Sequence, residues 1–247
     1  MTLFDHFLIL MLFLVQPIHG WLSFQRYLKK IAAGGPVDRP KLYRQTQLLE
    51  WGFLAALLAV FFSLSRDLGT LGFVDAGGTG FWICAALLTG GSIAMILSTK
   101  SVRQLSQSER DEQRAAFGDL GHFLPQNDED LASFYRVSVT AGIVEEIVFR
   151  GMLLGRLVKR FSKHWAAIIS AAAFAATHLL DPNAFLVVPG LFLVGVALAY
   201  LAYRSANLSL PIFVHMGVNG LAVLLLAFAD EIEDAVDPVE ALVRSLL

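Results

Sequence analysis

The sequence is poor in charge and nearly devoid of cysteine. Charged residues make up 16% of its 247 residues, whereas a soluble domain carries about 25%. The formal net charge at pH 7 is −2, so the chain lacks the basic excess that would point to nucleic acid as a partner. Cys84 is the single cysteine, which excludes an internal disulfide. The low charge argues against a soluble domain.

Hydrophobic residues are abundant instead. They make up 56% of the chain, and the mean hydropathy is +0.61. The apolar runs are continuous and do not alternate with polar residues, which indicates membrane-spanning helices and not a closed barrel. We therefore expect an all-α fold, a polytopic membrane bundle of about seven transmembrane helices. Because the chain is compact and carries no organelle address, the expected location is a prokaryotic inner (plasma) membrane.

Seven stretches have the composition of a membrane span, and they cover residues 7–24, 48–64, 81–98, 131–157, 165–180, 185–203 and 208–229. Residues 26–47 are expected to form a polar, basic connection, and residues 100–130 a charged segment long enough for a surface helix. The first stretch has a rival interpretation as a signal peptide. Asp5 and His6 precede it and no basic residue does, which favours a retained helix.

The chain divides into three expected parts. Residues 1–130 hold three transmembrane helices, residues 131–229 a core of four, and residues 230–247 an acidic tail. Asn127 and the three acids after it supply a cap and first-turn charges for a helix that begins there. In the tail, Asp237 and Pro238 precede an apolar stripe, and a short amphipathic helix on the membrane and a frayed end are equally compatible with it.

Basic residues gather in two places. The cluster within residues 26–44 argues that this connection is cytoplasmic. The cluster within residues 156–163 follows three spans later, so simple alternation of the spans puts it on the opposite side. Counting basic residues therefore does not select an orientation.

Three segments place ionisable or amide side chains inside expected spans, where they are costly. In the first, Glu146 and Arg150 are spaced i, i+4 with the acid first, the favourable order for an ion pair. Glu145 lies about 100° round the helix from Glu146, so it is free to meet water or another helix. The alternative is a purely structural role, in which both acids share Arg150 in a packing network.

The other two segments repeat the i, i+4 spacing. Phe174 and His178 end the span at 165–180, and the spacing sets the phenyl ring beside the imidazole. His215 and Asn219 share one face of the last span, with Gly217 leaving room beside them. A lone histidine is more often a packed residue than a catalyst, and polar pairs also join helices in membranes. Together, however, acid, base and amide are the groups needed to activate water and stabilise an oxyanion.

These segments resemble the motifs of the CPBP family, the CAAX proteases and bacteriocin-processing enzymes also called the ABI family. Its motifs EExxxR, FxxxH and HxxxN stand here as 145–150, 174–178 and 215–219, in the family's order. The resemblance covers residues 131–229. It implies an intramembrane endopeptidase with its active site inside the helical bundle, acting on a membrane-associated or C-terminal peptide, lipidated or not.

The resemblance also implies roles. Glu145 and His178 would activate water, and His215 and Asn219 would stabilise the oxyanion. In support, Glu146 and Arg150 would hold the motif helix in register, and Phe174 would pack the site.

Metal and non-enzymatic alternatives remain open from the sequence. Glu145, His178 and His215 are the residues that would bind zinc, since imidazole and carboxylate suit that ion. The sequence has no HExxH, and the resemblance implies a glutamate-driven reaction without metal, so no cofactor is expected. The alternatives to a peptidase are a non-catalytic scaffold or bacteriocin immunity protein on the same fold, and an ion- or proton-coupled transporter.

Overall fold

The computed structural model describes residues 2–72, 106–116, 118–180 and 188–227, and all the regular elements within these ranges are helices. The expected all-α fold is therefore confirmed. Three expectations lie outside the described residues: the span at 81–98 with Cys84, the first residues of the span at 185–203, and the acidic tail.

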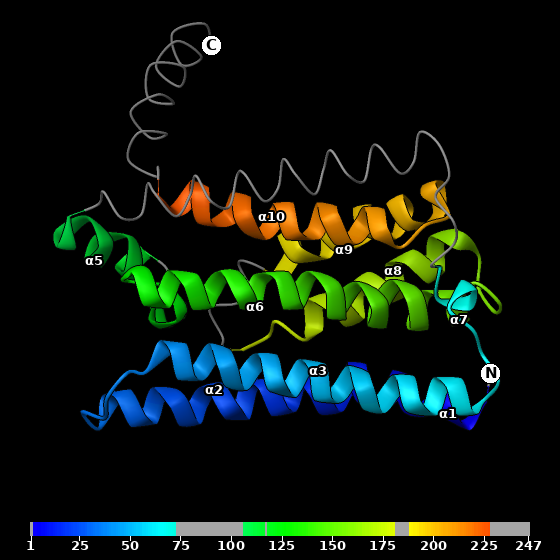
Figure 1. Ribbon diagram of the computed structural model, residues 1–247, viewed down its shortest axis with the longest axis horizontal. Helices are drawn as coiled ribbons and strands as arrows, with labels where there is room; N and C mark the ends of the chain where they lie inside the picture. The colour runs from blue at the N-terminus through cyan, green and yellow to red at the C-terminus, as the bar shows by residue number, and fades with distance from the viewer. Residues whose placement is uncertain (1, 73–105, 117, 181–187, 228–247) are drawn as a thin grey trace, which may run out of the picture.

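Two long antiparallel helices form one side of the molecule (Figure 1). The first is continuous through α1 (Leu3–Leu10), the π-helical η1 (Met11–Val15) and α2 (Gln16–Ala32), and the second is α3 (Arg39–Ser63). Thr2 and Asp5 cap the first helix reciprocally, which satisfies backbone N–H groups that a helix start leaves without partners.

The expected basic connection at 26–47 is wrong in its extent, because only residues 33–38 link α2 to α3. Lys29 and Lys30 lie in the last turn of α2, where cations interact favourably with the helix dipole. Asp38 caps α3 by accepting from the backbone N–H of Lys41, and Pro40 occupies its first turn. The polar residues thus extend both helices instead of interrupting them.

A third continuous helix runs beside α3 in the same direction. It consists of α6 (Asp128–Glu146), the π-helical η4 (Ile147–Leu154) and α7 (Gly155–Leu157). Arg39 pairs with Asp130 near the start of both helices at 3.6 Å. The Asn127 side chain accepts from the Asp130 backbone N–H, which confirms the predicted cap.

The remaining core helices are α8 (Lys163–Ala176), α9 (Val188–Ser205) and α10 (Ser209–Ala227). Small residues meet where α8 contacts α9: a Cβ on Gly195 of α9 would lie 3.0 Å from the Ala171 Cβ of α8. On the other face of the bundle, α10 lies against α6. Small residues therefore bring the backbones close in this half of the molecule.

Short helices complete the described chain. The predicted surface helix is present as α5 (Gln107–Ala116), followed by η3 (Gly118–Phe123), and η2 (Gly69–Leu71) lies in the loop after α3.

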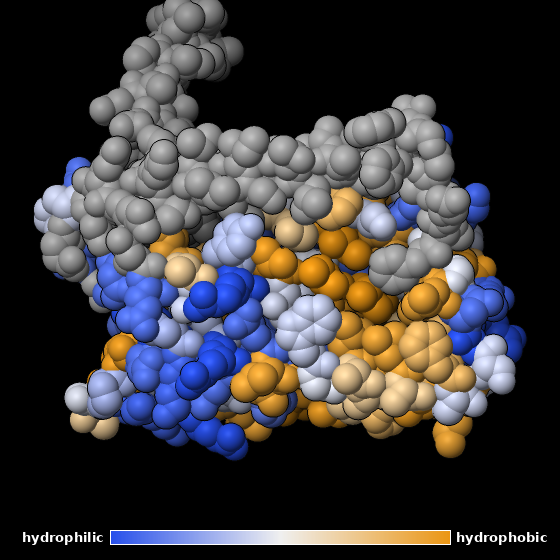
Figure 2. All heavy atoms as spheres, viewed as in Figure 1, coloured by the Kyte–Doolittle hydropathy of each residue, from blue (hydrophilic) through white to orange (hydrophobic). Residues whose placement is uncertain are grey.

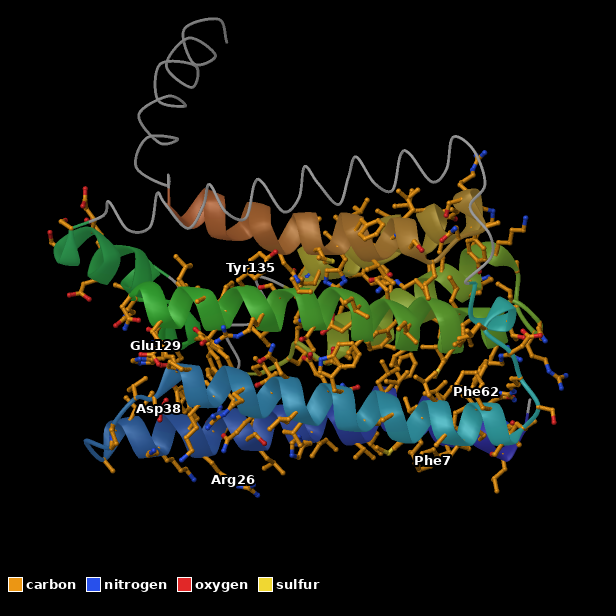
Figure 3. The ribbon with its side chains drawn as sticks, in the orientation of Figure 1. Phe7, Arg26, Asp38, Phe62, Glu129 and Tyr135 are labelled. Atoms are coloured by element: carbon orange, nitrogen blue, oxygen red, sulfur yellow. The ribbon has the colours of Figure 1, made fainter. Side chains whose placement is uncertain are left out.

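Three helices of the described residues are long and apolar enough to cross a membrane: Leu3–Ala32, Arg39–Ser63 and Val188–Ser205. The exposed face in Figure 2 is apolar over the half where Figure 3 places Phe7 and Phe62. The fold is thus a helical membrane bundle, and the predicted number of seven spans stays a prediction.

Polar residues gather at the ends of the bundle. Arg26, Asp38 and Glu129 mark one end in Figure 3, where α2 meets α3 and α6 begins. The second basic cluster follows α7 at the opposite end (Figure 1). The two basic clusters thus lie at opposite ends of the bundle, as simple alternation of the spans predicts. Because each end carries one cluster, the distribution of basic residues does not select an orientation in the membrane.

Candidate active site

A buried ion pair lies at the junction of α6 and η4. The Arg150 Nη1 atom donates to Glu146 Oε1 at 2.6 Å, and both side chains are 0% exposed. Arg150 Nη2 also donates to the carbonyl oxygen of Gly195 on α9 at 3.1 Å. The predicted i, i+4 pair is therefore present, and it ties the motif helix to α9.

His215 joins the last helix to the same carboxylate. Its Nδ1 lies 2.8 Å from Glu146 Oε1, across a buried contact between α10 and α6. A carboxylate only accepts hydrogen bonds when ionised, so Nδ1 carries the proton and donates. The Nε2 atom then points to Glu145, whose Oε2 lies 3.7 Å away.

Glu145 is the less constrained of the two acids. Its side chain is 18% exposed, against 0% for Glu146, and its Oε2 has no hydrogen-bond partner among the described residues. The helical offset between the acids leaves Arg150 to Glu146, as predicted, but both carboxyls approach the one imidazole of His215. The site therefore holds one carboxylate that is paired with arginine and one that is not.

His178 lies in the turn just after α8, and not inside the helix as expected from the span at 165–180. The side chains of Thr177 and His178 both bind the carbonyl oxygen of Phe174, at 2.7 and 3.0 Å. Side chains that take a backbone acceptor in this way compete with the helical hydrogen bond. The helix accordingly ends at Ala176.

The same hydrogen bond fixes the tautomer of His178. A carbonyl oxygen only accepts, so the imidazole donates from Nδ1 to Phe174, and the neutral ring keeps a lone pair on Nε2. His178 is thus arranged to accept a hydrogen bond from water at Nε2. The Thr177 Oγ1 atom also lies 3.2 Å from the His178 Nδ1 atom.

The Phe174 ring contacts three polar side chains of the site. Its ring centroid lies 5.0 Å from that of His178 and 5.6 Å from that of His215. The Arg150 guanidinium lies over the same ring at 4.7 Å, a distance typical of a cation–π contact. The Phe174 ring therefore lies beside the His178 imidazole, as the i, i+4 spacing predicts, and it also contacts η4 and α10.

Asn219 lies one turn beyond His215 on α10. Its Nδ2 donates to the carbonyl oxygen of Ser138 on α6 at 3.3 Å, whereas His215 bonds to Glu146. The two side chains therefore do not share one acceptor. An amide carries two N–H donors, so the bond to Ser138 leaves one for a ligand.

Close backbone contact brings α10 to this position. A Cβ on Gly142 would lie 2.6 Å from Met216 Cγ and 3.3 Å from the Met216 nitrogen. Only glycine allows the two helices to approach this closely, and the contact precedes the glutamates by a single turn of α6. Gly217 has no atom within 4 Å of an added Cβ, consistent with the room expected beside His215.

The site does not bring the hypothetical zinc ligands together. Across residues 2–72, 106–116, 118–180 and 188–227, no three His, Cys, Asp or Glu side chains are arranged to hold a metal ion. Glu145 and His215 approach each other, but His178 is directed to the Phe174 carbonyl.

Sequence reasoning missed the polar residues that α3 contributes beside this site. Gln47 Nε2 and Trp51 Nε1 each donate to Thr140 Oγ1 of α6 at 3.3 Å. Glu50 lies between these donors, and Glu145 acts on its carboxyl electrostatically. The available signal was an acid within the apolar run at 48–64, which is unusual in a membrane span.

Comparisons with known proteins match the part of the chain that carries the candidate site. Residues 127–221 match the family of Type II CAAX prenyl endopeptidase Rce1-like proteins. The "Putative membrane peptidase YdiL" of Bacillus subtilis (strain 168) is 30% identical over 88 residues, which cover 36% of this chain and 34% of that protein. The matching segment thus spans about a third of the length of this curated relative. No solved structure matches the chain.

Both matches agree with the resemblance drawn from the EExxxR, FxxxH and HxxxN motifs, all of which fall within residues 127–221. Residues 127–221 are therefore similar to the CPBP/CAAX protease family.

Proposed function

We propose that this protein is an intramembrane endopeptidase that hydrolyses a peptide bond with water activated by Glu145 and His178. The observation that carries the proposal is the contact of His215, from α10, with both carboxyls of the α6 motif. Residues from distant parts of the chain thereby converge at one buried point. Such convergence of acid and imidazole groups is typical of a hydrolytic site.

Glu145 is the general base in this proposal. Arg150 binds Glu146 and leaves Glu145 without a cationic partner on its own helix. Its carboxylate accepts a proton from water while the oxygen attacks the peptide carbonyl, and His178 Nε2 orients that water by accepting its second hydrogen. The proton then passes from Glu145 to the leaving nitrogen.

His215 and Asn219 stabilise the oxyanion of the tetrahedral intermediate. Asn219 offers the amide hydrogen that Ser138 leaves unused. Because His215 donates from Nδ1 to Glu146, it donates to the oxyanion only when Nε2 also carries a proton. Donors fixed in this way before the reaction are an effective source of transition-state stabilisation.

Glu146, Arg150 and Phe174 position these groups. Glu146 orients the His215 ring through Nδ1, and Arg150 neutralises Glu146 while binding the Gly195 carbonyl. Phe174 keeps the two imidazoles apart and covers the guanidinium. Hydrogen-bonded supporting residues of this kind fix the tautomer and direction of the rings that do the chemistry.

The proposed substrate is a membrane-associated or C-terminal peptide of the CAAX type, lipidated or not, and the proposed reaction needs no metal. The site lies in a helical bundle with an apolar face, so the substrate reaches it from the lipid bilayer. We place the protein in a prokaryotic inner membrane.

Comparative proteomics of membrane fractions tests the proposal. Cells carrying Glu145→Ala should accumulate an uncleaved precursor that wild-type cells process, and Glu112→Gln, which changes an exposed acid on α5, should not. Purified Glu145→Gln should remain folded and cleave that precursor at less than about a thousandth of the wild-type rate.

Two results would contradict the peptidase. Equal precursor levels in all strains, with the cellular phenotype retained by Glu145→Ala, would favour the scaffold or immunity protein. Ion flux through reconstituted wild-type protein, abolished by Glu145→Gln, would favour the transporter.

A further inference from the structure

Glu50 is an acid in the middle of α3, a helix apolar enough to cross a membrane. A carboxyl in that position is costly unless it is paired or used. Its Oε2 is buried and has no hydrogen-bond partner among the described residues, and it forms no salt bridge with any of them. The mechanism above does not use it.

Glu50 lies on the face of α3 that contacts α6. Gln47, three residues before it, and Trp51, directly after it, both donate to Thr140 Oγ1. Residues three and four apart share a helix face, so Glu50 is held at the same α3–α6 seam. Glu145 lies five residues beyond Thr140 on α6, and its charge acts on the Glu50 carboxyl.

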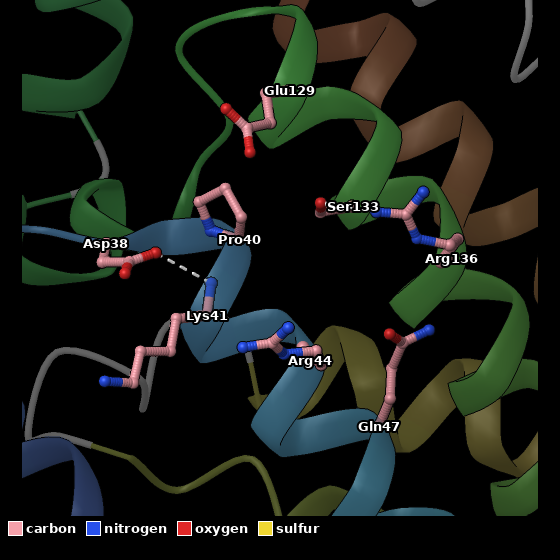
Figure 4. A pocket seen from close by; sticks show the side chains of 8 residues that line it. All are labelled: Asp38, Pro40, Lys41, Arg44, Gln47, Glu129, Ser133 and Arg136. Atoms are coloured by element: carbon pink, nitrogen blue, oxygen red, sulfur yellow. Dashed lines mark hydrogen bonds between the residues drawn. The ribbon is translucent and has the colours of Figure 1, made fainter.

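The contact between α3 and α6 also reaches the surface of the protein. A polar pocket of about 340 Å³ opens where α3 and α6 begin, and it is lined by basic, acidic and neutral polar side chains that include Arg44, Gln47, Glu129, Ser133 and Arg136. Figure 4 shows Gln47 of α3 and Arg136 of α6 on the two sides of this pocket. Gln47 also donates to Thr140, so polar contacts continue from the pocket to the turn that carries Glu50.

We propose that Glu50 is a proton-relay residue for Glu145, at the inner end of a polar seam between α3 and α6 that connects the site to the surface pocket. This inference rests on the proposed function, and it explains why an acid is placed in an apolar helix beside the general base. It adds a role for the N-terminal half of the chain, outside the segment that matches the CAAX protease family.

The relay has a task because the acid product leaves a proton in the site when the amine departs as the free base. Water gives its oxygen to the carbonyl carbon and one proton to Glu145, which passes it to the nitrogen as the C–N bond breaks. The products are then an amine and a carboxylic acid, whose proton returns to Glu145. Transfer of this proton to Glu50, and along the seam to water, restores the ionised Glu145 for the next turnover. The released amine takes up a proton from water outside the site, so the overall reaction loses no net proton.

Carbodiimide labelling tests the coupling without a substrate. Dicyclohexylcarbodiimide modifies protonated carboxyls in apolar surroundings, and mass spectrometry of the full-length protein in nanodiscs reports the labelled fraction at Glu50. At neutral pH Glu50 should be labelled in the wild type. Measured at an alkaline pH where most Glu50 is ionised, its labelling rate should fall by up to about tenfold in Glu145→Gln, the limit for carboxyls that interact by about one pK unit, and stay unchanged in Glu112→Gln.

Turnover measurements on the precursor found by proteomics test the relay itself. Glu50→Gln should cleave the first bound substrate at close to the wild-type rate but slow repeated turnover about tenfold or more. Glu50→Asp should restore part of the rate of repeated turnover, because aspartate keeps a carboxyl at this position. A purely structural role would lower both rates together and change the unfolding temperature.

Three results would overturn the relay: no labelling of Glu50, equal labelling rates in wild type and Glu145→Gln, or wild-type repeated turnover by Glu50→Gln. Failure of the peptidase proposal is recognised separately, by the absence of any precursor in Glu145→Ala cells.

Discussion

Arg150 donates to Gly195 from one nitrogen of its guanidinium and to Glu146 from another. A single side chain therefore neutralises a buried acid and holds α9 against the motif helix. Because Glu146 in turn binds His215 of α10, one charge pair links three helices around the site. The stability of the bundle and the geometry of the reaction thus depend on the same residues.

Replacing Arg150 should destabilise the protein strongly. Arg150→Gln leaves Glu146 charged and buried without its cation, which costs about 3–5 kcal/mol in the free energy of unfolding. Glu146→Gln combined with Arg150→Gln removes both charges and should recover part of this loss. Thermal unfolding of the purified protein in one detergent measures the effect.

Arg136→Gln is the matched control for this comparison, because Arg136 is exposed on the same helix and should change the free energy by less than about 1 kcal/mol. Equal unfolding temperatures for the Arg150 and Arg136 variants would show that the buried pair does not stabilise the bundle.

Adding one methyl group at Gly142 should disturb the site from a distance. The new Cβ of Gly142→Ala would lie 2.6 Å from Met216 Cγ, so α10 must move away from α6. We expect a loss of about 1–3 kcal/mol in unfolding free energy, together with reduced cleavage because Met216 follows His215. Unfolding and activity are measured on the same preparation.

The control is Gly52→Ala on α3, where no atom lies within 4 Å of the added Cβ. Alanine in an open helical position should stabilise slightly. If Gly142→Ala behaved like Gly52→Ala, close contact of α6 with α10 would not matter to the site.

Asn219→Ala should lower kcat by about 100- to 1000-fold with little change in KM, the effect of removing one oxyanion donor. Ser170→Ala provides the comparison, since Ser170 also donates a hydrogen bond from a helix to a backbone carbonyl, that of Phe149. Both variants should lose similar stability. A matching loss of activity in the two would indicate that Asn219 only joins helices.

Metal removal should leave the reaction intact. We expect full precursor cleavage after prolonged treatment with a strong chelator, because the proposed chemistry uses only side chains and water. Elemental analysis of the purified protein accompanies the assay. Activity that is lost on chelation and restored by zinc would require a different mechanism.

Local contacts around the candidate site could be predicted from the sequence. The Glu146–Arg150 pair, the contact of the Phe174 ring with His178 and the cap at Asn127 all join residues within one helical turn or the turn that follows it. Spacing along one helix determines such contacts.

Contacts between helices were harder to predict. Nothing in the spacing shows that His215 binds Glu146, or that α3 runs beside α6 with Glu50 near Glu145. The early end of α8 was also missed, because Thr177 and His178 compete for a backbone carbonyl that a periodicity argument assigns to the helix.

The π-helical η4 begins at the residue directly after Glu146 and includes Arg150. A π-helix closes its hydrogen bonds over one residue more than an α-helix does. It therefore corresponds to an α-helix that has accommodated an insertion, so the residues that follow η4 are rotated about the helix axis relative to a regular helix. Arg156 and Leu157, both buried in α7, owe the direction in which they point to this extra residue, and deleting one residue within η4 would turn them away from their present neighbours.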